Sequence, residues 1–160
     1  MYHRIRAAGL LIQDEHILLI KHTMNDQTFW VPPGGGLEPE DSTTRDTVIR
    51  EIKEESGLYV TEVSDLIYVR EFKSTTENTY HVEQFFLVKQ WQSELTLANL
   101  KGLGGDEHMI SEARFVHRDE LASMTVYPAE LKTDLWTRLS QPVLVPMHLG
   151  TQVEGDDAQF

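Results

Sequence analysis

Three glutamates lie within five residues of one another in the segment that runs from Arg50 to Glu55. At about 100° per helical residue, Glu51, Glu54 and Glu55 fall at about 0°, 300° and 40°, so a helix places all three carboxylates on one face. Such neighbours repel each other, and near a helix C-terminus they also oppose the helix dipole. Taken alone, such a cluster is usually a solvated face; a bound cation would offset the repulsion, and Mg²⁺ or Mn²⁺ suits the site because both prefer oxygen ligands.

A run of three glycines precedes this segment in the chain. Backbone without side chains can approach a phosphate closely, or offer a carbonyl oxygen to a metal ion. We therefore expect Gly34 and Gly36 to contact a substrate, and the carbonyl of Gly35 to contribute to the metal site. A plain flexible turn would explain the glycines but not the carboxylates that follow them. The arginine at position 50 can pair with Glu54 at i,i+4 and so orient the carboxylates.

Together these residues resemble the signature of the Nudix hydrolases, G-x5-E-x7-R-E-U-x-E-E-x-G-U, in which U is a bulky aliphatic residue. Residues 50–58 match every specified position of its second half. The resemblance extends over roughly residues 3 to 140. It implies an α/β fold, a Nudix-type α/β/α sandwich with a mixed β-sheet and the signature on a loop-helix-loop.

The first half of the signature allows two alignments. If Gly36 is the signature glycine, Ser42 occupies the position of the first glutamate. If Gly35 is chosen, Asp41 stands in for that glutamate and one extra residue separates it from the second half. We prefer the second alignment, and Glu40 is a further candidate for the acidic position.

The resemblance implies a metal-dependent hydrolase that cleaves the pyrophosphate of a nucleoside diphosphate linked to another moiety. Metal ions held by Glu51, Glu54 and Glu55 would neutralise phosphate oxygens and lower the pKa of a bound water. Arg50 joins them as a catalytic candidate. The substrate is a nucleoside triphosphate, a nucleotide sugar or ADP-ribose. The alternative is a Nudix-fold binding or sensor module that has lost catalysis, although the Arg-Glu and Glu-Glu core is intact.

Family members differ in where the general base lies. Glu51 is one candidate, and Glu107 is the candidate from a later loop, with Asp106 and Glu112 behind it. Any of these loop carboxylates could equally be a solvated surface group.

Lys21, at the end of a predicted strand, could reach a phosphate, and the aromatic rings of Trp30 and Tyr80 could stack on a base. For each of these aromatics, packing in the core is the simpler expectation. The histidines at positions 81, 108 and 117 lack zinc-site spacing, and the chain has no cysteine to assist them.

The length, charge and cysteine content of the whole chain are compatible with such a hydrolase. Its 160 residues suit one domain, and 14 basic against 26 acidic residues give a formal charge of −12, which opposes binding to nucleic acids or anionic membranes. The absence of cysteine excludes disulfides and thiolate catalysis, and no signal peptide or membrane span is seen, so we expect a cytoplasmic protein. Many relatives form dimers, which makes a homodimer a further expectation. The predicted domain covers residues 1–142, and residues 143–160 are expected to form a flexible tail.

Local patterns predict the elements that position these residues. A hairpin is expected with strands at 4–12 and 16–22, followed by a loop over 25–36. A helix capped by Ser42 or Thr43 should run to about Glu55, with Gly57 in the left-handed conformation just beyond it. Further strands are expected at 58–63, 66–72, 80–91 and 113–117, with a loop over 100–108, a helical turn at 118–121 and a final helix at 128–139.

Overall fold

The computed structural model describes residues 1–156, apart from the side chains at positions 105 and 106, as a mixed sheet with helices on both faces. The strands are β1 (Tyr2–Gln13), β2 (His16–Met24), β3 (Gln27–Val31), β4 (Gly34–Gly36), β5 (Leu66–Ser74), β6 (Thr79–Val88), β7 (Ile110–His117) and β8 (Met147–Val153). The α-helices are α1 (Thr44–Ser56) and α2 (Asp134–Leu139). Four 3-10 helices are η1 (Ala98–Leu100), η2 (Gly105–His108), η3 (Arg118–Ser123) and η4 (Ala129–Lys132). None of the helices in this part of the chain is long and apolar enough to cross a bilayer.

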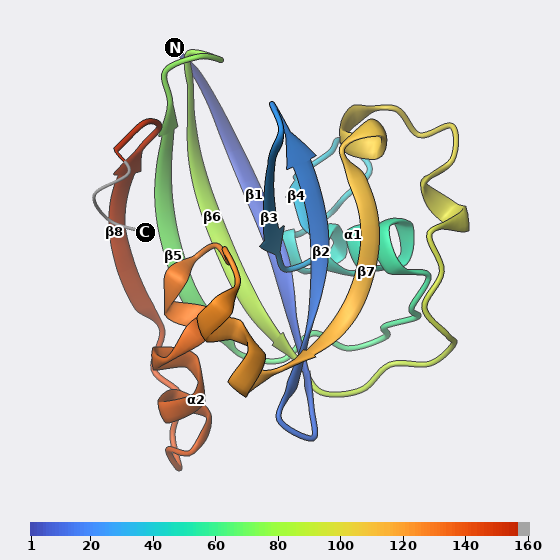
Figure 1. Cartoon of the computed structure of the whole chain (residues 1–160), viewed down its shortest axis with the longest axis vertical. Helices are drawn as coiled ribbons and strands as arrows, with labels where there is room; N and C mark the ends of the chain where they lie inside the picture. The colour runs from blue at the N-terminus through green and yellow to red at the C-terminus, as the bar shows by residue number, and fades with distance from the viewer. Residues whose placement is uncertain (157–160) are drawn as a thin grey trace.

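Strands β1 and β2 form the predicted hairpin, which opens into two diverging groups of strands. The two strands pair only near their turn, where Ile12 faces Ile17 and Gln13 faces His16. Beyond that point β1 pairs with β4 and, in parallel, with β6, and the sheet continues through β5 to β8. β2 pairs instead with β3 and β7. Figure 1 shows the two groups spreading apart above the hairpin, with β4 in the space between β1 and β2.

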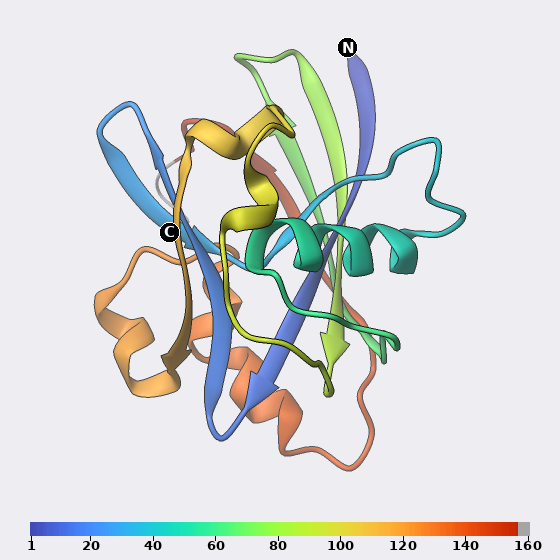
Figure 2. The same cartoon turned by 90° about the vertical axis from the view of Figure 1, so that its right-hand side faces the viewer.

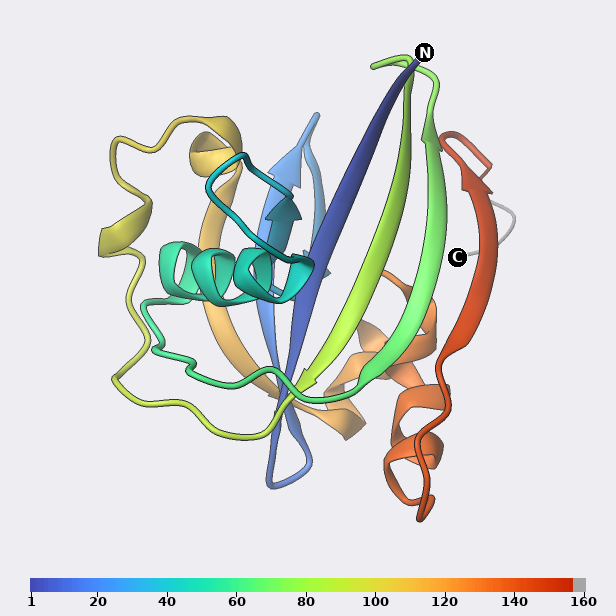
Figure 3. The same cartoon turned by 180° about the vertical axis from the view of Figure 1, so that it is seen from behind.

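Helices cover both faces of the sheet, which confirms the predicted sandwich. Neighbouring residues of β1 enter different cores: Leu11 packs with Val48 and Ile52 of α1, whereas Leu10 packs with Leu135 of α2. This burial on both faces explains why β1 and β2 read as near-continuous apolar runs. The segment with η3, η4 and α2 lies in front of the sheet in Figure 1, and α1 lies in front in Figure 3.

Four local expectations are wrong, and two of the errors arise from pairing with other strands of the sheet. The expected loop over 25–36 contains β3 and β4, because β2 and β1 offer them pairing partners. The expected strand at 58–63 is a connection with a single bridge between Tyr59 and Gln92. The expected final helix is split into η4 and α2. Part of the expected tail forms β8, which pairs in parallel with β5. Residues 157–160 of that tail lie outside the described part of the chain.

Candidate active site on the glycine strand and helix α1

Helix α1 begins and ends where its sequence predicts. Thr43 is the N-cap: its hydroxyl accepts a hydrogen bond from the backbone N–H of Asp46, whose carboxylate accepts one from the N–H of Thr43. Gly57 terminates the helix with a φ of 73°, the left-handed conformation that glycine adopts without strain. Figure 2 shows α1 running across β1 and β6, with residues 37–43 looping out to its N-terminal end.

A glycine in β1 lets the helix approach the sheet closely. A Cβ atom at Gly9 would lie only 2.7 Å from Cδ1 of Ile52, so a larger residue there would force the side chain of Ile52 to shift. Val48 and Ile52 pack against β1 from this distance and are fully buried. The adjacent face of α1, which carries the glutamates, is thereby brought against β4.

Two of the three predicted metal ligands contact the glycine strand. The backbone N–H of Gly34 donates a 2.9 Å hydrogen bond to Oε2 of Glu55, which is buried. A Cβ atom at Gly35 would lie 2.1 Å from Oε1 of Glu51, so a larger residue there would displace that carboxylate from its present position. Glu54 is the most accessible of the three, with 30% of its side chain exposed against 12% for Glu51.

Arg50 holds these parts together. Its Nη1 donates to Oε1 of Glu51 at 2.7 Å and to Oε2 of Glu54 at 3.4 Å, while Nη2 donates to the carbonyl oxygen of Gly36 at 2.9 Å. Nε and Nη2 also make a two-pronged contact with Asp41, at 3.2 and 2.8 Å. Four groups from the loop, the strand and the helix are therefore fixed by one guanidinium.

Asp41 is the acidic residue of the preceding loop that the fold joins to this network. Its carboxylate accepts hydrogen bonds from the hydroxyl of Thr47 at 2.9 Å and from the N–H of Glu38 at 3.1 Å, besides those from Arg50. The bonds from Arg50 in particular lower the pKa of Asp41. Glu40 and Ser42, the other candidates for the first acidic position, are exposed.

The donor set of the site fits a hard divalent cation. Burial raises the pKa of Glu51, which means that its negative charge is poorly solvated, although hydrogen bonding to Arg50 opposes the shift. Glu51, Glu54 and Asp41 share one guanidinium, so negative charge is in excess. Among residues 1–156, leaving aside the side chains at 105 and 106, no three acidic or histidine side chains are already spaced to enclose an ion. Oxygen ligands in an anionic, half-buried setting are nevertheless those that Mg²⁺ and Mn²⁺ prefer.

The other predicted residues lie elsewhere. The carboxylate of Glu107 accepts hydrogen bonds from the N–H groups of Gly102 and Gly104 within its own loop. Lys21 lies 5.8 Å from the ring centre of Trp30, and its Nζ is 3.9 Å from Oε2 of Glu112. These last three side chains come from β2, β3 and β7, the group of strands that diverges from β1. The side chain of Asp106 lies outside the described part of the chain.

Two arginines near the glycine strand were missed by sequence reasoning. Arg6 pairs in register with Gly36, and its charge acts on the carboxylate of Glu51. Arg4 lies beside the same glycine. The sequence does contain a signal for them: two arginines two residues apart on a predicted strand must share one face of the sheet.

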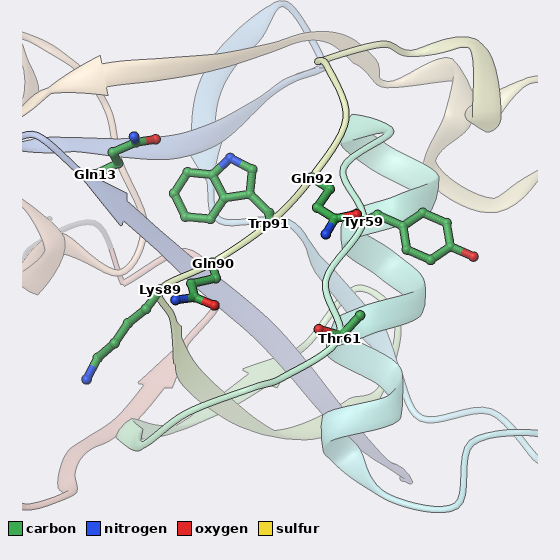
Figure 4. Close-up of a pocket in the computed structure, with 7 residues that line it drawn as sticks. All are labelled: Gln13, Tyr59, Thr61, Lys89, Gln90, Trp91 and Gln92. Carbon is green, nitrogen blue, oxygen red and sulfur yellow. The ribbon is translucent and has the colours of Figure 1, made fainter.

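A hollow in the surface lies away from this network. It has a volume of about 380 Å³ and is formed where residues 59–61 run beside residues 89–92 (Figure 4). Its lining is Gln13, Tyr59, Thr61, Lys89, Gln90, Trp91 and Gln92, none of which is a predicted site residue.

Comparison with known proteins identifies the family. The NUDIX domain model matches residues 3–136, and the chain therefore belongs to the NUDIX family and is by class a Nudix hydrolase. Nudix hydrolases generally use a divalent metal and act on small nucleotide substrates. No curated protein matches the chain.

Solved structures share the fold at low sequence identity. The E. coli ORF135 protein is 20% identical with a TM-score of 0.67, and the match covers 89% of this chain and 96% of that one. A MutT NUDIX hydrolase from Burkholderia pseudomallei is 18% identical with a TM-score of 0.67, covering 84% and 98%. An ADP-ribose pyrophosphatase from Streptococcus suis is 18% identical with a TM-score of 0.61, covering 93% and 98%.

Proposed function

We propose that this protein hydrolyses the pyrophosphate linkage of a nucleoside diphosphate joined to another moiety, with Mg²⁺ or Mn²⁺ as the cofactor. The observation that carries the proposal is the contact of two helix carboxylates, Glu51 and Glu55, with the bare backbone of β4. Carboxylate oxygens meet backbone that carries no side chains there, and these are the groups that bind a metal ion and a diphosphate together.

In this proposal Glu51, Glu54 and Glu55, with the carbonyl of Gly35, hold the metal. When bound, the metal neutralises the diphosphate oxygens and lowers the pKa of the attacking water. Water oxygen forms one P–O bond while the bridging P–O bond breaks, and the proton of the water passes to a carboxylate. Arg50 fixes the orientation of Glu51 throughout.

Glu51 is our candidate for the general base. Its raised pKa brings its proton affinity closer to what a base needs at neutral pH. The carboxylate of the loop candidate, Glu107, is hydrogen-bonded to two backbone N–H groups of its own loop and is therefore held toward that loop.

The proposed substrates are a nucleoside triphosphate, a nucleotide sugar or ADP-ribose. The printed names of two structural neighbours, a MutT hydrolase and an ADP-ribose pyrophosphatase, fall within this range. Gly34 and Gly36 would contact the diphosphate. Lys21, on the opposite group of strands, would contact the remainder of the substrate, whereas Trp30, which forms a cation–ring pair with Lys21, is buried in the core and would support that lysine.

The experiment is a substrate screen with three proteins. Wild type, Glu51→Gln and the control Glu62→Gln, which alters an exposed glutamate, are incubated with nucleoside triphosphates, ADP-ribose and nucleotide sugars. We expect hydrolysis only with Mg²⁺ or Mn²⁺, a loss of at least about 10²-fold in kcat for Glu51→Gln, and no change for the control. If nucleotides bind but neither wild type nor variants hydrolyse any of them, the chain is a binding module and the proposal fails.

Three broader expectations belong to the same proposal. They are a cytoplasmic location, a homodimeric state, and a catalytic domain within residues 1–142. Size-exclusion chromatography with light scattering tests the second, and the activity of a chain truncated after residue 142 tests the third.

A further inference from the structure

Two rows of side chains cross the sheet on the face opposite α1. Parallel pairing of β1 with β6 places Arg4 beside His81 and Arg6 beside Glu83. Antiparallel pairing extends the second row to Arg70 on β5 and to Gly36 on β4. Because strand residues alternate between faces, and Ala7 packs against α1, the side chains at positions 4 and 6 point away from the helix.

The two rows hold three arginines, Arg4, Arg6 and Arg70, and one carboxylate, Glu83, in a chain whose formal charge is −12. Glu83 is the carboxylate between the arginines: its Oε2 lies 2.5 Å from Nη2 of Arg70, and its Oε1 lies 3.5 Å from Nε of Arg6. One carboxylate thus serves two guanidiniums. The remaining donor capacity of Arg6 is available, since 27% of its side chain is exposed.

Arg4 has no carboxylate partner in the part of the chain that the structure describes. Among residues 1–156, leaving aside the side chains at 105 and 106, no acidic group lies within 4.0 Å of its guanidinium. Yet the group is not far out in solvent, because a Cβ atom at Gly36 would lie 2.5 Å from its Nε and 2.6 Å from its Nη2. A solvent-accessible guanidinium is therefore placed directly on the bare strand whose other face meets Glu51.

The neighbouring histidine, His81, carries a buried ring nitrogen without a hydrogen-bond partner in the described residues. The residue is 5% exposed, and the nitrogen is Nδ1. Burial lowers the pKa of His81, and the charges of Arg6 and Arg4 act in the same direction, while those of Glu83 and Glu77 oppose them. The positive charge of this face consequently resides on the arginines.

We propose that Arg4 and Arg6 form an anion subsite on the face of β4 opposite Glu51, where they bind a phosphate group of the substrate beyond the hydrolysed linkage. The inference rests on the proposed function and narrows its substrate class. It favours substrates with a third phosphate or a similar anionic group, such as nucleoside triphosphates, over nucleotide sugars whose sugar is neutral. Guanidinium groups suit this role because their planar forks match phosphate oxygens.

The glycine strand makes this arrangement feasible. β4 pairs with β1 along one edge, and its three residues carry no side chains between the two faces. A polyphosphate lying along this thin strand can meet Glu51 and Glu54 on one side and the arginines on the other.

The test measures binding of inorganic tripolyphosphate by calorimetry, with EDTA present so that no metal contributes. The proteins are wild type, Arg4→Gln, Arg6→Gln and the control Arg118→Gln. Arg118 pairs with Glu15 at the turn of the β1–β2 hairpin, far along β1 from Arg4, and the control removes the same charge. We expect Kd to rise about tenfold or more for each of the first two variants, and less than twofold for the control.

Three outcomes would overturn the subsite. Wild type fails to bind tripolyphosphate, Arg4→Gln and Arg6→Gln bind as well as wild type, or all three variants weaken binding equally, which would indicate non-specific attraction. Circular dichroism and thermal unfolding check that Arg6→Gln is folded, and Arg4→Gln, which breaks no ion pair, provides the second arm.

The same proteins distinguish a failure of the hydrolase proposal from a failure of the anion subsite. Glu51→Gln should lose hydrolysis yet bind tripolyphosphate in EDTA as wild type does. If no nucleotide is hydrolysed while the arginine variants still lose tripolyphosphate binding, the hydrolase proposal is wrong and the anion subsite stands. For an active enzyme, Arg4→Gln should raise KM for a nucleoside triphosphate more than for a nucleotide sugar with a neutral sugar.

Discussion

Two arginines lie against the same glycine from different sides and have opposite surroundings. Arg50 donates to the carbonyl of Gly36 and also binds Asp41, Glu51 and Glu54, so its guanidinium is engaged within the chain. Arg4 lies at van der Waals range of Gly36 and, in the described residues, has no acidic partner. Arg50 maintains the geometry of the site, while the N–H donors of Arg4 are available to the proposed anionic ligand.

The difference follows from position rather than residue type. Arg50 lies on a helix, where its neighbours at i+1 and i+4 are glutamates, and it faces a loop that supplies Asp41. Arg4 lies on a strand whose neighbours across the sheet are His81 and a glycine strand. The same guanidinium group is therefore structural in Arg50 and available for a ligand in Arg4. The following measurements test this difference.

The largest expected effect comes from removing the engaged guanidinium. Arg50→Gln should lower the free energy of unfolding by about 3–5 kcal/mol, because the carboxylates of Asp41 and Glu51 are mostly buried and would lose their cation. Urea denaturation followed by circular dichroism measures the change. A loss below about 1 kcal/mol would show that the network is not structurally important.

Binding of a divalent cation to the carboxylates of the candidate site should stabilise the folded protein. Saturating Mn²⁺, at about 100 times its Kd, should stabilise wild type by about 2.7 kcal/mol and raise its Tm, and removal with EDTA should reverse the shift. Glu51→Gln should show a much smaller shift, and Glu62→Gln the full one. An equal shift in all three proteins would place the metal elsewhere.

The ion pair between Asp41 and Arg50 should make the free energy of unfolding depend on pH. Its pKa is lowered in the folded state by Arg50, so its contribution to stability is present above the unfolded-state pKa and is lost as the pH falls through the folded-state pKa. Asp41→Asn should therefore cost about 1.5–3 kcal/mol at neutral pH, and the difference from wild type should shrink on acidification below pH 4. A difference independent of pH would refute the role assigned to the charge.

The smallest effect is expected at the unengaged arginine. Arg4→Gln should change the free energy of unfolding by less than about 0.5 kcal/mol, because no ion pair is broken. The same urea titration used for Arg50→Gln provides the comparison. A loss similar to that of Arg50→Gln would mean that Arg4 is structural, and the contrast between the two arginines would collapse.

Elements with local signals were predictable from the sequence. The limits of α1 follow from a capping threonine and a terminal glycine, and the shared face of the glutamates follows from helical spacing. The family signature added the fold. Each of these inferences needs only residues within one segment.

The rest depends on partners distant in the chain. The glycines at 34–36 have the local preferences of a loop, and they become a strand because β1 lies beside them. Met147–Val153 becomes a strand for the same reason, through β5. Sequence spacing could not decide among Glu40, Asp41 and Ser42, since the outcome depends on which side chain the loop directs toward Arg50.

The central claim, that the glutamates of α1 hold a divalent cation, is tested most directly by Mn²⁺ binding measured with electron paramagnetic resonance. Wild type, Glu51→Gln, Glu54→Gln, Glu55→Gln and the control Glu62→Gln are titrated with Mn²⁺ without substrate. The account predicts that each of the first three substitutions raises Kd about tenfold or more, while the control matches wild type. Equal Mn²⁺ affinity in wild type and all three variants would contradict it.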